Sequence, residues 1–355
     1  MFLSSAATAA IASGSDKGVL PSEAKRFADA ATEFIVYRLT DPAHQSWLPA
    51  FYGRAISHRG DFLLYASDRS GSVQGYRMDL KSGESREVTN QTGLLAASLT
   101  LTPDEKNACY VAGRSVQMAS LSNLRVRQVY QIPEGYEAGN GFSVTDDGIY
   151  ALLVERRAER HRLRLITMRT GAAVTVVEVA EPLSDPMPRP RRAGILYRRG
   201  GDFWLINFDG AQNRRLKLEA GGLGPGMWSP DGREVLYLNL PADRKQLNNV
   251  RAFTPDANDD RLIARTSQFV HFGRNADASV LVGASGSKAS PYVLLLVRSV
   301  KRELTLCEHR ASDPSKVAPI FSPNSHRIYF QSDRDGKLAI YSMNVERLVA
   351  ETEIE

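Results

Sequence analysis

A hairpin module that recurs about every 45 residues constrains the fold of this chain more than any other feature. Its clearest copies are residues 228–238 (WSPDGREVLYL) and 321–330 (FSPNSHRIYF). In each copy an aromatic residue ends one strand, a turn rich in Pro, Asp, Asn, Gly or Ser follows, and an apolar strand begins. Weaker copies are residues 56–65, 101–110, 143–150 and 272–282.

The spacing of these turns gives the number of modules. They begin near residues 57, 102, 145, 229, 274 and 322, so successive turns are 45, 43, 84, 45 and 48 residues apart. Because 84 is nearly twice the other gaps, a copy is hidden near residue 187, where residues 186–197 read PMPRPRRAGILY. The chain therefore contains seven modules.

A second turn signal follows the first hairpin, most clearly at residues 67–71 (SDRSG) and 332–336 (SDRDG). Two further short strands come after it, and four short strands per repeat are typical of a β-propeller blade. The sequence predicts an all-β, seven-bladed propeller of four-stranded blades. The last module has only three strands, and residues 34–40 form a strand without a module, so we expect this N-terminal strand to close the ring and leave no long free edge.

We expect residues 31–355 to form this single domain and residues 1–30 to be a leader. Residues 1–14 have the small, apolar character of an export signal but lack its basic start. They are either the tail of a truncated signal, which would place the protein in the periplasm or outside the cell, or a disordered leader of a cytoplasmic protein.

The composition limits the classes of molecule that the protein can be expected to bind. The net charge of +5 favours an acidic partner, but the basic residues are spread along the chain, which argues against nucleic acid. No segment has the roughly 18 consecutive apolar residues of a membrane span. Cys109 and Cys307, the two cysteines, lie in apolar strand-like runs, where we interpret them as unreactive packing.

The SPDG and SDRxG turns are similar to the TolB-type propeller repeat, a class with many functions. Three stretches are more specific: residues 34–92, residues 129–135 (VYQIPEG), and residues 204–210 (WLINFDG) followed by the turn at 228–232. Together they resemble the oligogalacturonate lyase family over nearly the whole chain after the leader.

The resemblance implies a seven-bladed lyase that splits short galacturonide chains by β-elimination in pectin degradation. Such a reaction needs a base for the proton α to the uronate carboxylate and a cation for the charge that develops on that carboxylate. In the family a His is the base, an Arg assists, and a manganese ion held by several His and a Gln binds the carboxylate.

Several of these positions are occupied by other residue types here. Pro225 stands at the place of the family's base, and Asp202 stands at the place of its Arg. Lys316 and Ala318 replace the two His of the metal site, and only His271 remains at a metal-ligand position. The resemblance therefore leaves no catalytic residue in place, and we expect no bound cofactor.

Three residues are candidates for substrate binding. Lys316 could replace the metal cation in holding a uronate carboxylate, or be a solvated loop lysine. His44 and Arg54 flank the first inner strand, where they could reach the channel or simply cap turns.

Two functions remain open from the sequence. The first is an oligogalacturonate lyase with a rearranged site, and the second is a pseudoenzyme, a non-catalytic propeller that binds an acidic oligosaccharide or, as a TolB-like scaffold, a protein partner. Whether the chain is an enzyme is therefore undecided. No Ser-His-Asp order, phosphate-binding loop or paired-Cys metal motif points to another reaction class.

Overall fold

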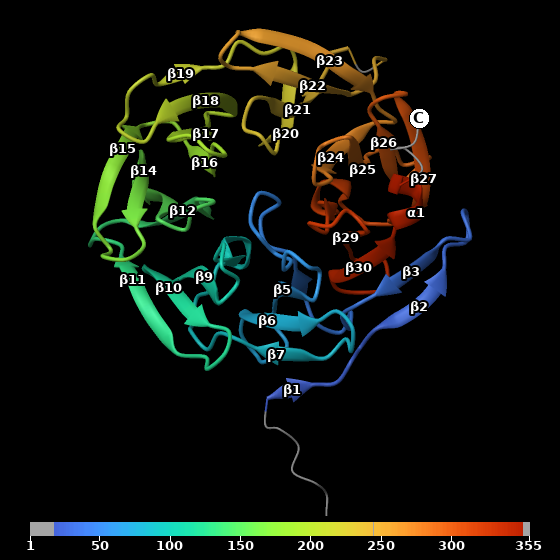
Figure 1. Ribbon diagram of the computed structural model, residues 1–355, viewed down its shortest axis with the longest axis horizontal. Helices are drawn as coiled ribbons and strands as arrows, with labels where there is room; N and C mark the ends of the chain where they lie inside the picture. The colour runs from blue at the N-terminus through green and yellow to red at the C-terminus, as the bar shows by residue number, and fades with distance from the viewer. Residues whose placement is uncertain (1–17, 244, 351–355) are drawn as a thin grey trace, which may run out of the picture.

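The computed structural model describes residues 18–243 and 245–350. Within these residues thirty strands form seven blades around a central channel, and the chain colours run once around the ring from blue to red (Figure 1). The strands make six hydrogen-bonded sheets, because blades 3 and 4 are joined through one parallel pair, Asn140 with Ser184. The predicted all-β propeller with seven blades is confirmed.

The first four blades contain the strands that follow, each blade beginning with the strand nearest the channel. Blade 1 contains β4 (Ser46–Trp47), β5 (Phe62–Ser67), β6 (Gln74–Asp79) and β7 (Ser85–Glu87). Blade 2 contains β8 (Thr100–Leu101), β9 (Asn107–Ala112), β10 (Ser115–Ser120) and β11 (Val126–Gln131). Blade 3 contains β12 (Glu137–Val144), β13 (Tyr150–Arg157), β14 (Arg160–Thr167) and β15 (Ala173–Val179). Blade 4 contains β16 (Leu183–Pro188), β17 (Gly194–Arg199), β18 (Asp202–Asn207) and β19 (Arg214–Arg215).

The remaining blades complete the ring. Blade 5 contains β20 (Gly222–Trp228), β21 (Val235–Leu240), β22 (Asn249–Thr254) and β23 (Asp259–Arg265). Blade 6 contains β24 (Phe269–Arg274), β25 (Val280–Ser285), β26 (Tyr292–Val297) and β27 (Arg302–Glu308). Blade 7 contains β28 (Ile320–Phe321), β29 (Arg327–Ser332) and β30 (Ala339–Asn344), joined by β3 (Ile35–Arg38). The described helices are the 3₁₀ turns η1 (Ala96–Ser98) and η2 (Pro314–Lys316) and the short α1 (Glu346–Ala350).

The N-terminal strand closes the ring as predicted. β3 pairs antiparallel with β30, with Arg38 opposite Tyr341, and the Ile340 N–H donates to the Thr40 hydroxyl at 3.0 Å. Two short strands add to this plan: β2 (Lys25–Ala28) pairs with β3, and β1 (Val19–Leu20) pairs with β7, so blades 1 and 7 have five strands each. Residues 19–20 and 25–28 of the expected leader thus lie in blades, while residues 1–17 lie outside the described residues.

The repeated SPDG turn is explained by its hydrogen bonds. The Ser229 hydroxyl donates to the Asp231 carboxylate at 2.6 Å and accepts from the Glu234 N–H at 2.9 Å. The last blade uses Ser322 and Asn324 in the same way, with the hydroxyl donating to the amide oxygen at 2.6 Å. A hydroxyl residue followed two positions later by Asp or Asn fixes the turn locally, which is why the repeat can be read from the sequence.

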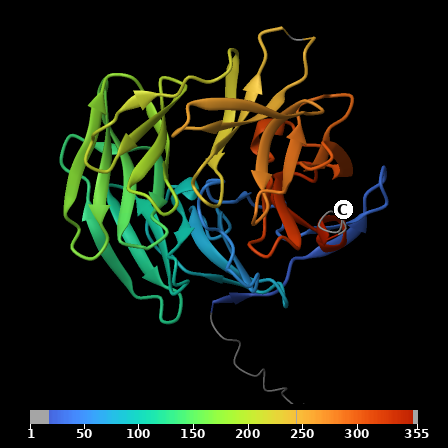
Figure 2. The ribbon, with the colours of Figure 1, turned by 45° about the horizontal axis from the view of Figure 1, so that its top comes forward.

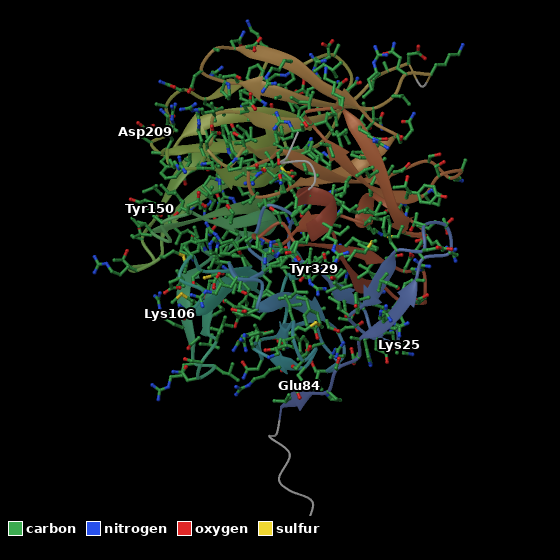
Figure 3. All side chains as sticks on the ribbon, turned by 45° about the vertical axis from the view of Figure 1, so that its right-hand side comes forward. Lys25, Glu84, Lys106, Tyr150, Asp209 and Tyr329 are labelled. Carbon is green, nitrogen blue, oxygen red and sulfur yellow. The ribbon has the colours of Figure 1, made fainter. Side chains whose placement is uncertain are left out.

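The core lies between neighbouring blades. Strands such as β5 and β25 are buried at every residue because both faces of a blade pack against other blades. Charged side chains such as Lys25, Glu84 and Lys106 project from the periphery in Figure 3, whereas Tyr329 is 1% exposed. Within the described residues the structure contains no helix with the length and apolar character of a membrane span.

The inner strands give the channel two distinct ends. β12 and β16 are parallel, and in every blade the SPDG-type turn follows the inner strand, so all inner strands run in the same direction. The tilted view shows the longer strands of the blades running between the two faces of the ring (Figure 2). We call the end where the inner strands begin the start end, and the end where the turns lie the turn end.

Candidate functional site

Residues 48–56, here named the plug segment, enter the channel between β4 and β5. In Figure 1 this is the blue loop that reaches the centre of the ring. Its two ends are held by different blades: the Leu48 N–H donates to the Gln331 side chain at 2.7 Å, and the Arg54 N–H donates to the Thr100 hydroxyl at 2.9 Å. The segment is therefore fixed in position by blades 7 and 2.

Phe51 and Tyr52, at the tip of the plug segment, separate two cavities. The smaller, of about 500 Å³, lies at the start end beside blades 2 to 4, and the larger, of about 570 Å³, lies at the turn end. Both aromatic residues line both cavities, and their rings contact each other edge to face at 5.1 Å between centroids. The plug segment therefore gives the channel two separate cavities.

Asp185 is the charged residue of the described lining of the smaller cavity. It lies in a bulge of β16 between Ser184 and Met187, and its φ of 49° is in the left-handed region that non-glycine residues rarely adopt. Gly141 allows this bulge to approach β12, because a Cβ at this position would lie 2.2 Å from the side chain of Pro186. The local backbone thus directs a carboxylate into the cavity at a conformational cost.

Arg198, on β17, holds this carboxylate. Its Nε lies 3.3 Å from an oxygen of Asp185, and its guanidinium also donates to the carbonyls of Gly201, at 2.9 Å, and Gly224. Burial raises the pKa of Asp185, and the positive charge of Arg198 partly opposes that effect. The result is a desolvated carboxylate that is more basic than an exposed one and is held by a planar cation.

Tyr52 is the second residue of this cavity whose pKa is shifted. Burial raises the pKa of its phenol well above the usual value of 10.0, and the negative charge of Asp185 raises it further. Tyr52 therefore stays protonated at neutral pH and can act as a hydrogen-bond donor. Asn140 and Ser184 add an amide and a hydroxyl to the same lining.

His271, on β24, lies on the opposite side of the plug segment. It is 7% exposed, its ring contacts Phe51 edge to face at 5.2 Å, and its Nδ1 has no hydrogen-bond partner. Burial lowers its pKa from 6.5 to about 4. His271 is therefore a neutral imidazole packed under an aromatic ring.

The residues at the other family positions do not form a common site. Pro225 lies within β20, next to the Gly224 carbonyl that Arg198 contacts. Asp202 begins β18, the third strand of blade 4, and forms an ion pair with Arg215 at 2.9 Å. The Lys316 side chain is 68% exposed, its ammonium lies 3.7 Å from Asp313, and it lines neither cavity.

The two remaining candidates from the sequence lie apart. Arg54 lines the larger cavity, where it forms an ion pair with Asp146. His44 lies in a turn, 4.0 Å from a carboxylate oxygen of Asp68, and lines neither cavity. The structure therefore brings none of His44, Arg54, Lys316 and His271 into direct contact with another.

The described residues do not fit the manganese ion that the family resemblance implies. No group of three or more His, Cys, Asp or Glu among residues 18–243 and 245–350 is arranged to hold a metal. One imidazole with a free Nδ1 does not bind a divalent ion tightly by itself. We therefore derive no step that uses a metal.

Tyr52, Asp185 and Arg198 are functional candidates that the sequence reading missed. Asp185 and Arg198 come together across the β16–β17 hairpin, and Tyr52 arrives from blade 1. The sequence signal that could have found Asp185 is the pair Asp185-Pro186. A proline inside a strand of the repeated module indicates a bulge in that strand.

Comparisons with known proteins agree with this architecture. Residues 16–161 match a family model described as oligogalacturonate lyase. An oligogalacturonide lyase of Pectobacterium atrosepticum is 24% identical over 381 residues, covering 92% of this chain and 97% of that protein. An oligogalacturonate lyase of Dickeya dadantii is 23% identical, covering 90% of this chain and 95% of that protein.

Solved structures show the same fold. An oligogalacturonate lyase in complex with manganese superimposes with a TM-score of 0.86 at 23% identity, covering 92% of this chain and 98% of that one. An oligogalacturonate lyase from Vibrio parahaemolyticus gives a TM-score of 0.85 at 22% identity, covering 93% and 98%. The resemblance that the motifs indicated is thus confirmed, and the chain is similar to oligogalacturonate lyases over about nine-tenths of its length.

Proposed function

We propose that this protein is a lyase that cleaves uronate-containing oligosaccharides by β-elimination at the start end of the channel. The similarity to oligogalacturonate lyases supports a lyase function at the level of the family. The observation that carries the proposed site is the buried carboxylate of Asp185, held by Arg198 in a cavity of about 500 Å³.

In this proposal Asp185 takes the proton α to the substrate carboxylate. The electrons of that C–H bond form the new carbon–carbon double bond, and the glycosidic oxygen leaves with the electrons of its bond to carbon and then accepts a proton. A base with a raised pKa suits this step because its protonated form is less costly. Arg198 positions Asp185 through its 3.3 Å ion pair and its contacts with backbone carbonyls.

Tyr52 is a hydrogen-bond donor of the proposed site. Its phenol remains protonated because burial and Asp185 raise its pKa. A protonated phenol can donate to the substrate carboxylate as negative charge develops, or to the departing oxygen. Asn140 and Ser184, in the same lining, can donate to sugar hydroxyls.

The pH dependence of the rate follows from this assignment. Asp185 is active only as the carboxylate, and burial raises its pKa from the ordinary value of 3.8. The rate should therefore rise with pH through a midpoint above 3.8, and a plateau extending below this value would exclude Asp185 as the base.

A second candidate is binding of an acidic oligosaccharide without cleavage. It is favoured by Pro225 and Asp202, which stand where the family resemblance expects a base and a cation. Adding trigalacturonate to the purified protein separates the two functions. We expect ultraviolet-absorbing unsaturated product; heat of binding in calorimetry without any product would instead establish the second candidate.

Salt and variants show which cations hold the substrate. Affinity should weaken as salt rises, because a uronate is anionic. Lys316 was the sequence-based choice, but its side chain is 68% exposed and paired with Asp313. We expect Lys316→Ala to change affinity by less than about twofold, and a larger loss would return Lys316 to the site.

A further inference from the structure

The larger cavity, at the turn end, lies across Phe51 and Tyr52 from the proposed lyase site. It has a volume of about 570 Å³ and is bounded by the ends of inner strands or the turns that follow them in all seven blades. Phe51 and Tyr52 form its floor and separate it from the smaller cavity. A ligand can therefore occupy it without contacting Asp185.

Arg274, at the end of β24, brings a positive charge to this cavity. Its Nε donates to the Trp228 carbonyl at 2.9 Å, and one Nη donates to the Asn275 carbonyl at 3.1 Å. Within the part of the chain that the structure describes, no carboxylate lies within ion-pair distance of this guanidinium. Burial lowers the pKa of Arg274, and the negative charges of Asp146 and Asp231 partly oppose that effect.

The other charged side chains of this lining make close contacts of their own. Arg54 forms an ion pair with Asp146, whereas Glu105 accepts a hydrogen bond from the His58 backbone N–H and keeps its negative charge. Arg274 is thus the arginine of the described lining that forms no ion pair, although the more distant carboxylates of Asp146 and Asp231 also act on its charge.

The walls around Arg274 are mostly apolar. Four aromatic residues and five prolines line the cavity: Phe51, Tyr52, Trp228, Phe321, Pro103, Pro188, Pro190, Pro230 and Pro323. A concave, mostly apolar wall with a small number of polar groups is the usual form of a small-molecule site.

We propose that this cavity binds a small monocarboxylate with an apolar body, its carboxylate paired with the Arg274 guanidinium and its body against the proline and aromatic wall. A planar guanidinium matches a carboxylate in two parallel hydrogen bonds. The ligand supplies the directly contacting anion that Arg274 lacks among the described residues. This inference does not depend on the proposed lyase function.

Benzoate and benzamide are matched probes, since they share shape but differ in charge. Titrated calorimetrically into the full chain, benzoate should bind saturably and benzamide at least about tenfold more weakly, because a charge-assisted hydrogen bond is roughly twice as strong as a neutral one. Equal affinity for the two probes, or no benzoate binding at tens of millimolar, would overturn the proposal. This comparison needs no variant.

Variants then place the site. Arg274→Gln should weaken benzoate binding at least about tenfold, whereas Arg233→Gln, at a 79% exposed side chain in the turn after β20, should leave it unchanged. Should Arg274→Gln not fold, Arg274→Lys keeps the charge and loses the planar fork, so we expect weaker binding than in the parent. If a folded Arg274 variant binds benzoate with the affinity of the parent, Arg274 is not part of the benzoate site. Asp185→Asn should bind benzoate as the parent does, because benzoate does not contact Asp185. Benzoate binding therefore tests the Arg274 site separately from the lyase proposal.

Discussion

His271 should make the stability of this protein depend strongly on pH. The side chain is 7% exposed under Phe51, and burial lowers its pKa from 6.5 to about 4. Between these values the unfolded chain binds a proton at His271 and the folded chain does not, so the free energy of unfolding falls as pH falls. Above 6.5 both states are neutral, and this contribution to stability is fully present.

The pKa interval sets the size of the effect. At about 1.4 kcal/mol per pH unit, the interval from 6.5 to about 4 corresponds to at most about 3 to 4 kcal/mol. His271→Gln removes the titrating group, so its free energy of unfolding should fall about 2 to 3 kcal/mol less than that of the parent between about pH 7 and about pH 4. His309, whose pKa is also lowered by burial, is present in both proteins and cancels in the comparison.

The assay is urea unfolding followed by tryptophan fluorescence at several pH values, with His326→Gln as the matched control. The His326 side chain is 50% exposed, and we expect that variant to follow the parent. An equal fall in the parent and in His271→Gln would refute the inference that His271 is a desolvated neutral imidazole.

Three further predictions concern closure, cysteines and metal. Thr40→Val should lower the free energy of unfolding by about 1 to 2 kcal/mol in urea titration, because the buried Ile340 N–H loses its acceptor; no change would mean that this bond does not stabilise ring closure. Burial raises the pKa of the Cys109 thiol to about 12, and Cys109 and Cys307 are both 0% exposed, so a thiol reagent should label both only after unfolding; labelling of the native protein would contradict their burial. Elemental analysis after desalting should find no stoichiometric divalent metal, and one ion per chain would show that ligands outside the described arrangement hold it.

The architecture could be predicted because its determinants are local. The hydroxyl of Ser229 and the carboxylate of Asp231 fix a turn within a few residues, so the repeat is visible as a repeated string. The closing strand β3 could be predicted by counting strands. β1 and β2 could not, because two to four largely exposed residues show no apolar alternation.

The candidate site could not be predicted in the same way, since it depends on contacts between distant segments. Tyr52 reaches Asp185 only because the plug segment enters the channel, and Asp185 faces the cavity only because β16 bulges. The family pattern predicts Lys316 near the channel, but Lys316 lies in η2, where its ammonium is near Asp313. Sequence position locates a residue along a blade, whereas the direction of its side chain depends on the loop that carries it.

Release of unsaturated product from trigalacturonate by Asp185→Asn tests the central claim most directly. Asp202→Asn is the matched control, because it makes the same change in the same blade at a side chain that is 38% exposed and paired with Arg215. With Asp185 as the base, the Asp185 variant should lose at least about a hundredfold in kcat with little change in KM, while the Asp202 variant keeps parent activity. Product release by Asp185→Asn at the parent rate would contradict the proposed site.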